Sequence, residues 1–564
     1  MFIENLKEEM YDVISKERLL VLVSMNVDAL CACKILQWLL KCDNVEYTLL
    51  SIRGKDDLVK AYQHHSEQVK HVVLINCGGS LNIIELLQPL DDVMFYIADS
   101  HRPLDLDNIY NQDQIKILMK EGEILEVPEF DDIYAASDDE EDEDSDEDNG
   151  TPLKRRRTDD SESPHKSSKE KRLWHKKRQT ILYQYYENAF HGTSSAIVLY
   201  ELCWKLNKDS NLALWWASVG LTDQLINERV SDEKYNADSR SLHQHVLRLN
   251  QDNIEENGVS SNLMKLTFEH DLRLTLYRHW SLFQSFSHSM YTACRFRIWT
   301  LKGKRRLREF LAEIGLPLHQ CQQKFSAMDV TLKNTLKDSV LEVAEKYGLD
   351  EILFGSFNVQ LGFKIKLTAS DVVFAVAALI ENSTEEGKAY SENFFEGLDA
   401  LSRCNLGGES LEKGLDLSKK HLVAIWNQVH SFLSTHQIVC AGPFLYAHVR
   451  EGAPDFQVFS TPMNATRLAK FVQNCYVIMS KNKRAAMLPL ILTAPLNLDT
   501  GTCLVVGIPP VADDTRKNFL GRAFELAAEK TKCRSFHDNC EPAVVEIKSK
   551  DRGKFFDALS SLLA

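Results

Sequence analysis

Apolar runs and amphipathic stretches alternate along the first quarter of the chain. The apolar runs are nearly continuous, which predicts strands that are buried on both faces. We expect these strands at residues 19–23, 47–52, 71–76 and 93–98. Helical spacing fills the intervals, at 28–40, 56–69 and 81–87. Strands that alternate with helices predict an α/β domain built on a parallel sheet.

The pattern breaks after residue 134. Ten of the eleven residues from 138 to 148 are acidic, and basic stretches follow at 154–157 and 166–178. Such blocks bury too little apolar surface to fold. We therefore expect a disordered, exposed insert at 135–168 that divides the first domain into residues 1–134 and 169–224.

Two further regions follow. Residues 225–395 read as almost wholly helical, and 396–564 read as a last α/β unit. In that unit we expect strands at 437–440, 457–459, 488–492, 503–508 and 544–547, and helices at 466–479, 516–530 and 551–563. The predicted fold class is α/β, with an N-terminal parallel-sheet domain, an inserted all-helical domain and a C-terminal α/β domain.

Charge and cysteine usage narrow the class of protein. The 564 residues carry a formal net charge of −15, which argues against a protein that holds duplex DNA by bulk electrostatics. The thirteen cysteines form no C-x-x-C pair, so we expect reduced thiols in the cytosol or nucleus. No apolar run approaches membrane-spanning length, and we expect no membrane association.

Polar side chains stand where the predicted strands end, which is where parallel sheets collect functional residues. The first strand leads into a run that contains Ser24, Asn26 and Asp28. Asn76 ends the third strand, and the fourth leads into Asp99, Ser100 and His101. A small-residue segment ends at Asp223, which we place at a fourth strand end.

These four clusters resemble the motifs of the DHH phosphoesterase superfamily, in particular its RecJ-type single-strand nucleases. The superfamily shows D-x-D-x-D-G, D-x-G, D-H-H and a lone Asp, and the positions above match these motifs in order. Ser24, Asn26 and Asn76 replace three of the six carboxylates, Ser100 replaces one of the two histidines, and Ala29 replaces the motif glycine.

Two neighbouring divalent ions need several anionic ligands, and Asn is a poor substitute for carboxylate. We therefore predict a vestigial site with no catalytic residues, no metal and no cofactor. A single weakly held ion on Asp28, His101 and Asp223 is the alternative. A purely structural reading has Asp28 capping the helix that follows it, with Asp99 and His101 bonding a turn.

A narrower resemblance covers essentially the whole chain. Seven segments are similar to the RecJ-related family of eukaryotic replication initiation, a component of the CMG replicative helicase: 26–36, 191–196, 215–224, 268–274, 369–375, 505–510 and 518–524. The resemblance implies a subunit that joins the minichromosome-maintenance ring and the GINS complex, alongside other initiation factors and the DNA polymerase machinery. It also implies a helical insertion that contacts the ring and a C-terminal domain similar to the DHH-associated domain. The chain lacks the Gly-Gly-His substrate loop of the nucleases and any Walker A motif, so a partner would supply ATPase activity.

Three charged features suggest regulation or binding. Acids follow Ser137 and Ser145, which suits an acidophilic kinase, although a solvated spacer is an equal reading. A bipartite nuclear import signal is predicted from Lys154, Arg155, Arg156, Arg157, Lys171, Arg172, Lys176, Lys177 and Arg178. A basic helix contains Lys302, Lys304, Arg305, Arg306 and Arg308. These residues either contact a partner protein or DNA, or they form a solvated helix face, which is the simpler interpretation.

The sequence thus favours a nuclear, non-enzymatic scaffold of the replicative helicase that binds single-stranded DNA weakly. The alternative is a manganese-dependent single-strand exonuclease or DHH-type phosphoesterase. An acidic chromatin-binding adaptor is a third, weaker reading.

Overall fold

The computed structural model describes residues 2–134, 168–256, 264–362, 365–383, 389–480, 482–513, 515–533, 535–536 and 541–564. These residues form two compact units, one of Met1–Glu121 with Ala189–Ala564 and a smaller one of Gly122–Asn188. No helix in the described ranges combines the length and apolar character needed to cross a membrane.

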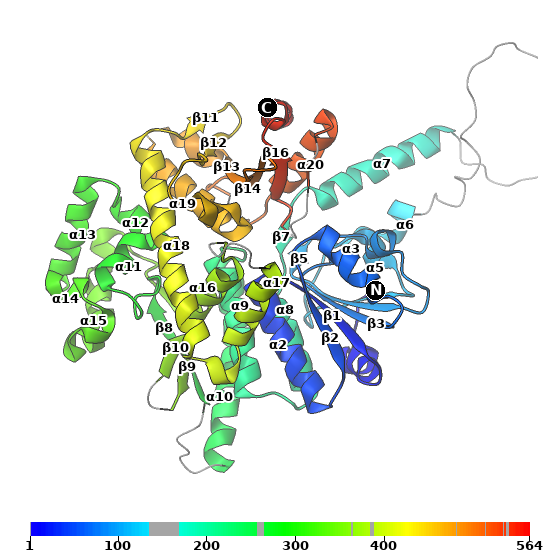
Figure 1. Ribbon diagram of the computed structural model, residues 1–564, viewed down its shortest axis with the longest axis horizontal. Helices are drawn as coiled ribbons and strands as arrows, with labels where there is room; N and C mark the ends of the chain where they lie inside the picture. The colour runs from blue at the N-terminus through cyan, green and yellow to red at the C-terminus, as the bar shows by residue number, and fades with distance from the viewer. Residues whose placement is uncertain are drawn as a thin grey trace, which may run out of the picture. The chain divides into compact units, whose positions relative to one another are not determined.

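A five-stranded parallel sheet organises the N-terminal part (Figure 1). Its order is β2-β1-β3-β4-β6, with β1 Leu19–Ser24, β2 Tyr47–Ile52, β3 His71–Ile75, β4 Met94–Ala98 and β6 Ile115–Ile117. The four predicted strands are confirmed, and the fifth was missed because β6 has only three residues. Because β1 lies between β2 and β3, the chain reverses direction across the sheet at β1, which is where α/β sheets place ligand sites.

Helices cover this sheet. The first ones are α2 Val27–Cys42, α3 Lys55–Gln63, α4 Ile83–Leu87 and α5 Leu106–Tyr110. Two more pack against α2 and are mostly buried, α8 Ser195–Lys205 and α9 Asn211–Ile226. A two-residue antiparallel pair joins β5 His101–Arg102 to β7 Phe190–His191. The N-terminus adds η1 Lys7–Tyr11 and α1 Asp12–Ile14.

The smaller unit contains two described helices, α6 Phe130–Tyr134 and α7 Ser168–Tyr186. The ion pair between Lys177 Nζ and Asp132 Oδ1, 2.5 Å apart, links them. The predicted insert falls almost entirely outside the described residues, and so do Ser137, Ser145 and the basic residues 154–157.

The expectation that residues 225–395 are all helical is wrong. A three-stranded antiparallel sheet crosses them, with β8 Met264–Leu272, β9 Leu353–Leu361 and β10 Ile365–Thr368 in the order β10-β9-β8. In β8 the exposed Lys265 alternates with the buried Met264 and Leu266, the period of a strand. The Phe268 and Phe357 rings, 4.8 Å apart, pack across β8 and β9.

The remaining middle and later elements are mainly helical. They are α10 Asp232–Glu256, α11 Leu282–His288, α12 Met290–Phe296, α13 Leu301–Glu313, α14 Leu318–Gln322, η3 Phe325–Ala327, α15 Val330–Ala344, η4 Glu345–Tyr347, α16 Ala369–Ile380, α17 Tyr390–Ala400, η5 Arg403–Asn405 and α18 Glu409–Ser434. Hydrophobic cores cross the predicted domain borders here. Leu266, Phe357 and Val372 pack with the N-terminal sheet, whereas Leu307 and Phe310 share a core with the C-terminal sheet.

The C-terminal part is a six-stranded mixed sheet of order β11-β12-β13-β14-β16-β15. Its elements are β11 Val439–Cys440, β12 Leu445–His448, η6 Phe456–Ser460, α19 Pro462–Met479, η7 Lys483–Met487, β13 Leu490–Asn497, β14 Thr502–Ile508, α20 Leu520–Thr531, β15 Ser535–Phe536, β16 Val544–Lys548 and α21 Arg552–Leu563. The strand expected at 457–459 is wrong, since those residues form the 3-10 turn η6 that leads into α19. The α/β fold class as a whole is confirmed.

Candidate functional site

The carboxyl ends of β1 and β3 bring the first two motif clusters together. The two strands pair in parallel, so Ser24 at the end of β1 and Asn76 just after β3 meet at one edge of the sheet. Asn26 is the N-cap of α2, and its Oδ1 accepts from the Ala29 amide at 2.7 Å. The expectation that Asp28 caps this helix is therefore wrong.

Asp28 instead accepts hydrogen bonds from the start of α8. Its carboxylate accepts from the amides of Ser195 and Ala196 at 3.0 and 3.1 Å, and from the hydroxyl of Ser194. A carboxylate at a helix N-terminus satisfies free amides and complements the helix dipole. Asp28 thus joins two helices that are separated by more than 150 residues of sequence.

Asn76 is the hub of the hydrogen bonds at this edge. Its Oδ1 accepts from the Ser100 amide at 2.9 Å and the Ser195 hydroxyl at 2.6 Å. Its Nδ2 donates to Asp28 at 3.0 Å and to Asn26 at 3.2 Å. A backbone amide can only donate, so the contact with Ser100 fixes the orientation in which the NH₂ group faces Asp28.

Asp99 and His101 form a buried pair beside this hub. Asp99 Oδ1 lies 2.6 Å from His101 Nδ1 and also accepts from the His101 amide, while its Oδ2 accepts from the amides of Gly78 and Gly79. Burial raises the pKa of Asp99, but the charge and hydrogen bonds of His101 outweigh it and bring the pKa to about 2. Burial lowers the pKa of His101, but the charge and hydrogen bond of Asp99 outweigh burial. The pKa of His101 therefore lies above its usual value. The two side chains therefore form an ion pair.

Asp223 does not lie at a strand end, so that expectation is wrong. It lies within the last turn of α9, where its carboxylate accepts from Asn227 Nδ2 at 2.8 Å and lies 3.2 Å from Arg229 Nη1. The small residues of segment 217–223 let neighbouring helices approach α9 closely. This packing role explains the small-residue segment that we had placed at a strand end. Burial raises the pKa of Asp223 to about 6, despite the Arg229 charge.

The structure adds two site residues that the sequence did not single out, His191 and Glu541. The pairing of β5 with β7 sets His191 opposite His101, with ring centroids 5.0 Å apart. Glu541 Oε1 lies 3.9 Å from His191 Nε2 and accepts from Arg229 Nη2 at 2.5 Å. His191 belongs to segment 191–196, one of the seven segments on which the family resemblance rests, and this could have pointed to it. No motif or resemblance in the sequence included Glu541.

Arg229 therefore connects two distant parts of the larger unit. Its guanidinium bonds Asp223 on one side and Glu541, just before β16, on the other. Burial raises the pKa of Glu541, but Arg229 and the nearby histidines outweigh it and bring the pKa to about 2. The loop after α9 is held further by Lys470 of α19, which donates to the Asn227 carbonyl.

A backbone pair closes the same junction. The amides and carbonyls of Ala189 and Asn518 bond each other at 2.9 and 2.7 Å. The motif residues are nearly inaccessible, with Asp28 1% and Asn76 1% exposed. The start of α8 contacts both of them through Ser195.

The donor set does not fit a pair of divalent ions. Each carboxylate oxygen of Asp28, Asp99 and Asp223 already accepts at least one hydrogen bond from the protein. Within the described ranges, the group that could hold a metal is instead His101, His191 and Glu541, whose ligand atoms lie within 4.8 Å of one another. Arg229 is bonded to Glu541 there, so a guanidinium supplies the positive charge at that position.

The other predicted site residues lie elsewhere. Lys171, Arg172, Lys176, Lys177 and Arg178 belong to α7 in the smaller unit. The five basic residues at 302, 304, 305, 306 and 308 are exposed on α13, while Leu307 and Phe310 of the same helix are buried. This arrangement agrees with both readings of the basic helix.

Comparison with known proteins decides the family. The sequence matches the family model CDC45 over residues 19–149 and 128–562. The chain belongs to the CDC45 family. The cell division control protein 45 homolog of Homo sapiens is 44% identical over the full length of both chains, and that of Schizosaccharomyces pombe is 30% identical over 95% of each. The crystal structure of CDC45 from Entamoeba histolytica matches all of both chains with a TM-score of 0.70 at 22% identity, which supports the fold.

Proposed function

We propose that this CDC45-family chain acts in DNA replication as a non-catalytic scaffold of the replicative helicase in the nucleus. It joins the minichromosome-maintenance ring to the GINS complex, in contact with other initiation factors and the DNA polymerase machinery, and binds single-stranded DNA weakly. The observation that carries the non-catalytic part is the amide of Asn76 donating to Asp28. Asn76 stands at the position where the resemblance expects the metal-bridging Asp, so a neutral amide faces Asp28 there.

Burial supports the same proposal. A phosphodiester substrate would have to reach Asp28 and Asp99, yet these side chains are covered and bonded by protein groups on both oxygens. Exposing them would break the buried hydrogen bonds of Asp28 and Asn76 with the start of α8. Leaving a buried polar group without its hydrogen-bond partner costs about 1–3 kcal/mol.

A nuclease assay tests the absence of catalysis. The purified full chain is incubated with Mn²⁺ and end-labelled single-stranded oligonucleotides, and we expect no cleavage above that of an Asp28→Ala, Asp99→Ala double variant. Metal-dependent turnover by the wild type that vanishes in this variant would establish the exonuclease alternative.

A binding assay tests the scaffold. The exposed cations of α13 are the candidate contact, because Leu307 and Phe310 anchor the helix and leave its charged face outward. Reversing Lys302, Lys304 and Arg308 to Glu should weaken co-purification with the ring. The matched control reverses Lys7, Lys16 and Lys41, which are also exposed and change the net charge equally. Equal retention by both variants would place the interface elsewhere.

A large deletion is a poor substitute for these variants. Residues 225–395 contribute Leu266, Phe357 and Val372 to the core of the N-terminal sheet. Removing them would unfold that core rather than delete a surface. For nuclear entry, the test is alanine substitution of residues 154–157 together with Lys176, Lys177 and Arg178, with nuclear accumulation as the measurement.

A further inference from the structure

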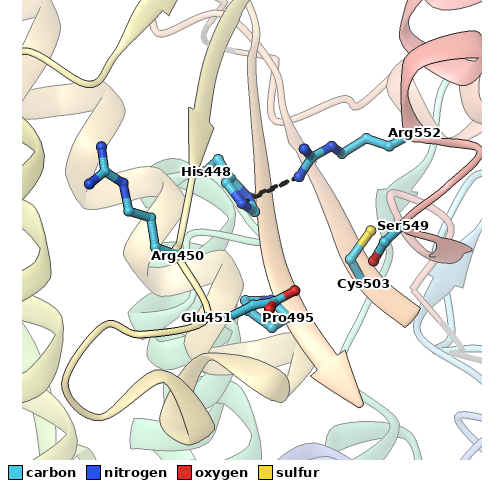
Figure 2. A pocket seen from close by; sticks show the side chains of 7 residues that line it. All are labelled: His448, Arg450, Glu451, Pro495, Cys503, Ser549 and Arg552. Atoms are coloured by element: carbon cyan, nitrogen blue, oxygen red, sulfur yellow. Dashed lines mark hydrogen bonds between the residues drawn. The ribbon is translucent and has the colours of Figure 1, made fainter. Parts of the chain in front are cut away.

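A pocket of about 240 Å³ opens beside the C-terminal sheet, and no motif residue described above lines it (Figure 2). His448 ends β12, and Arg450 and Glu451 follow two and three residues later. Ser549 lies in the turn after β16, and Arg552 is the first residue of α21. Pro495 and Cys503 complete the wall from β13 and β14.

The charge of this pocket is positive. Arg450 and Arg552 line it with a single carboxylate, that of Glu451, and no ion pair forms to any of the three within the described part of the chain. Figure 2 shows Arg552 pointing toward His448, whereas the guanidinium of Arg450 points away from the other lining residues. The adjoining segment 548–554 also carries Lys548, Lys550 and Lys554 against one acid, Asp551. A local excess of cations in a chain of net charge −15 indicates an anionic ligand.

The contact between Arg552 and His448 leaves the guanidinium available. Arg552 Nη1 lies 3.4 Å from His448 Nδ1 and 3.3 Å from Nε2. An atom nearly equidistant from both ring nitrogens aligns with neither lone pair, so the contact is a poor hydrogen bond. Thr493 Oγ1, 2.8 Å from Nδ1, holds the ring in place. Burial and the Arg552 charge lower the pKa of His448, which keeps the ring neutral near pH 7.

The start of α21 adjoins this pocket. Arg552 is the first residue of this twelve-residue helix, and its N-cap, Asp551, makes no side-chain capping bond. A methyl group built on Gly553 would meet no other heavy atom within 4 Å, so the space beside Gly553 is open. Helix N-termini with free amides favour phosphate.

We propose that this pocket binds a phosphate monoester carried by a phosphorylated serine or threonine of a partner protein. Arg552 and the Ser549 hydroxyl, with Arg450 at the rim and the start of α21 next to them, match the charge and the three acceptor oxygens of that group. Single-stranded DNA fits less well, because it needs an extended basic groove with aromatic stacking platforms, and no Phe, Tyr or Trp lines the pocket. The pocket is independent of the proposed scaffold function and of its vestigial site.

Titration calorimetry on the full chain tests the proposal. The probes are inorganic phosphate, a Gly/Ser peptide with one phosphoserine, its unphosphorylated twin and a single-stranded oligothymidine. The variants are Arg552→Ala, Arg552→Lys and Arg450→Ala, with Arg484→Ala as an exposed arginine of the same sheet region that lies outside the pocket. Circular dichroism confirms that each variant is folded.

We expect the phosphopeptide to bind and to compete with inorganic phosphate, while the unphosphorylated twin does not bind. Arg552→Ala and Arg450→Ala should each weaken binding roughly ten- to hundredfold, Arg552→Lys should weaken it less, and Arg484→Ala should leave it unchanged. The proposal is overturned if the wild type binds no phosphopeptide, or if Arg552→Ala binds it equally well. Oligothymidine binding that requires Arg552, without phosphopeptide binding, would assign the pocket to nucleic acid instead.

Discussion

The side-chain amide nitrogen of Asn76 lies 3.0 Å from a carboxylate oxygen of Asp28, with both groups buried. The amide donates a hydrogen bond where a second carboxylate would repel Asp28 and call for a cation between them. The resulting network is complete without a metal.

Replacing Asn76 by Asp should destabilise the protein. The new carboxylate would lose both donated hydrogen bonds and stand against Asp28, at an expected cost of about 3 kcal/mol in the free energy of unfolding. Denaturant unfolding measures this loss. Asn44→Asp is the matched control, because Asn44 also has a positive φ, of 54°, but is exposed; it should shift stability by no more than about 0.5 kcal/mol. Recovery of the lost stability by added Mn²⁺ would revive the metal-site reading.

Gly220→Ala should also destabilise, although alanine ordinarily favours a helix. A Cβ at Gly220 would lie 2.8 Å from Asp28 Oδ1 and 2.7 Å from the Ala196 Cβ, so α9 could not stay close to α8. We expect a loss of about 1–3 kcal/mol. The control is Gly553→Ala in α21, where nothing obstructs the new methyl group and a gain of up to about 1 kcal/mol is expected. Equal changes in the free energy of unfolding for the two variants would contradict the close approach of α9 to α8 at Gly220.

Arg229→Met should loosen the junction between the sheets. The variant leaves Asp223 and Glu541 without their shared guanidinium, at a cost of about 3–5 kcal/mol. Hydrogen exchange at the Ala189 and Asn518 amides should accelerate, since these bonds close the same junction. The control is Arg305→Met, because Arg305 forms an exposed ion pair with Glu309 on one helix. This variant should lower the free energy of unfolding by about 0.5 kcal/mol or less. Unchanged exchange in Arg229→Met would mean that other contacts hold the junction.

The pH dependence of stability should change in Asp223→Asn. Burial raises the folded-state pKa of Asp223 to about 6, against about 4 in the unfolded chain. Between these values the folded state keeps a proton that the unfolded state has released, so the Asp223 contribution to stability is lost as the pH rises through this window. Removing the group should make the slope of stability against pH more positive by up to about 1.4 kcal/mol per pH unit. Unfolding at pH 4.5 and pH 6 measures the slope, and identical slopes in wild type and variant would refute the shifted pKa.

The sequence predicted four of the five strands of the parallel sheet and the motif residues at the ends of β1, β3 and β4. This succeeded because a buried parallel strand needs a continuous apolar run, and its carboxyl end needs a polar break. The period-two pattern of β8 was missed because polar and charged residues alternate there with Met264 and Leu266, and helical residues surround the strand on both sides.

The sequence by itself determined that Ser24, Asn26 and Asn76 are uncharged at positions where the resemblance expects carboxylates, because residue identity alone decides whether a side chain can carry charge. Tertiary structure decided what took their place. It set Asn76 to donate to Asp28, brought His191 beside His101, and placed Glu541 on Arg229 more than 300 residues away in the chain. Such partners come from strand pairing and from packing between distant segments, and no local spacing in the chain encodes either of them.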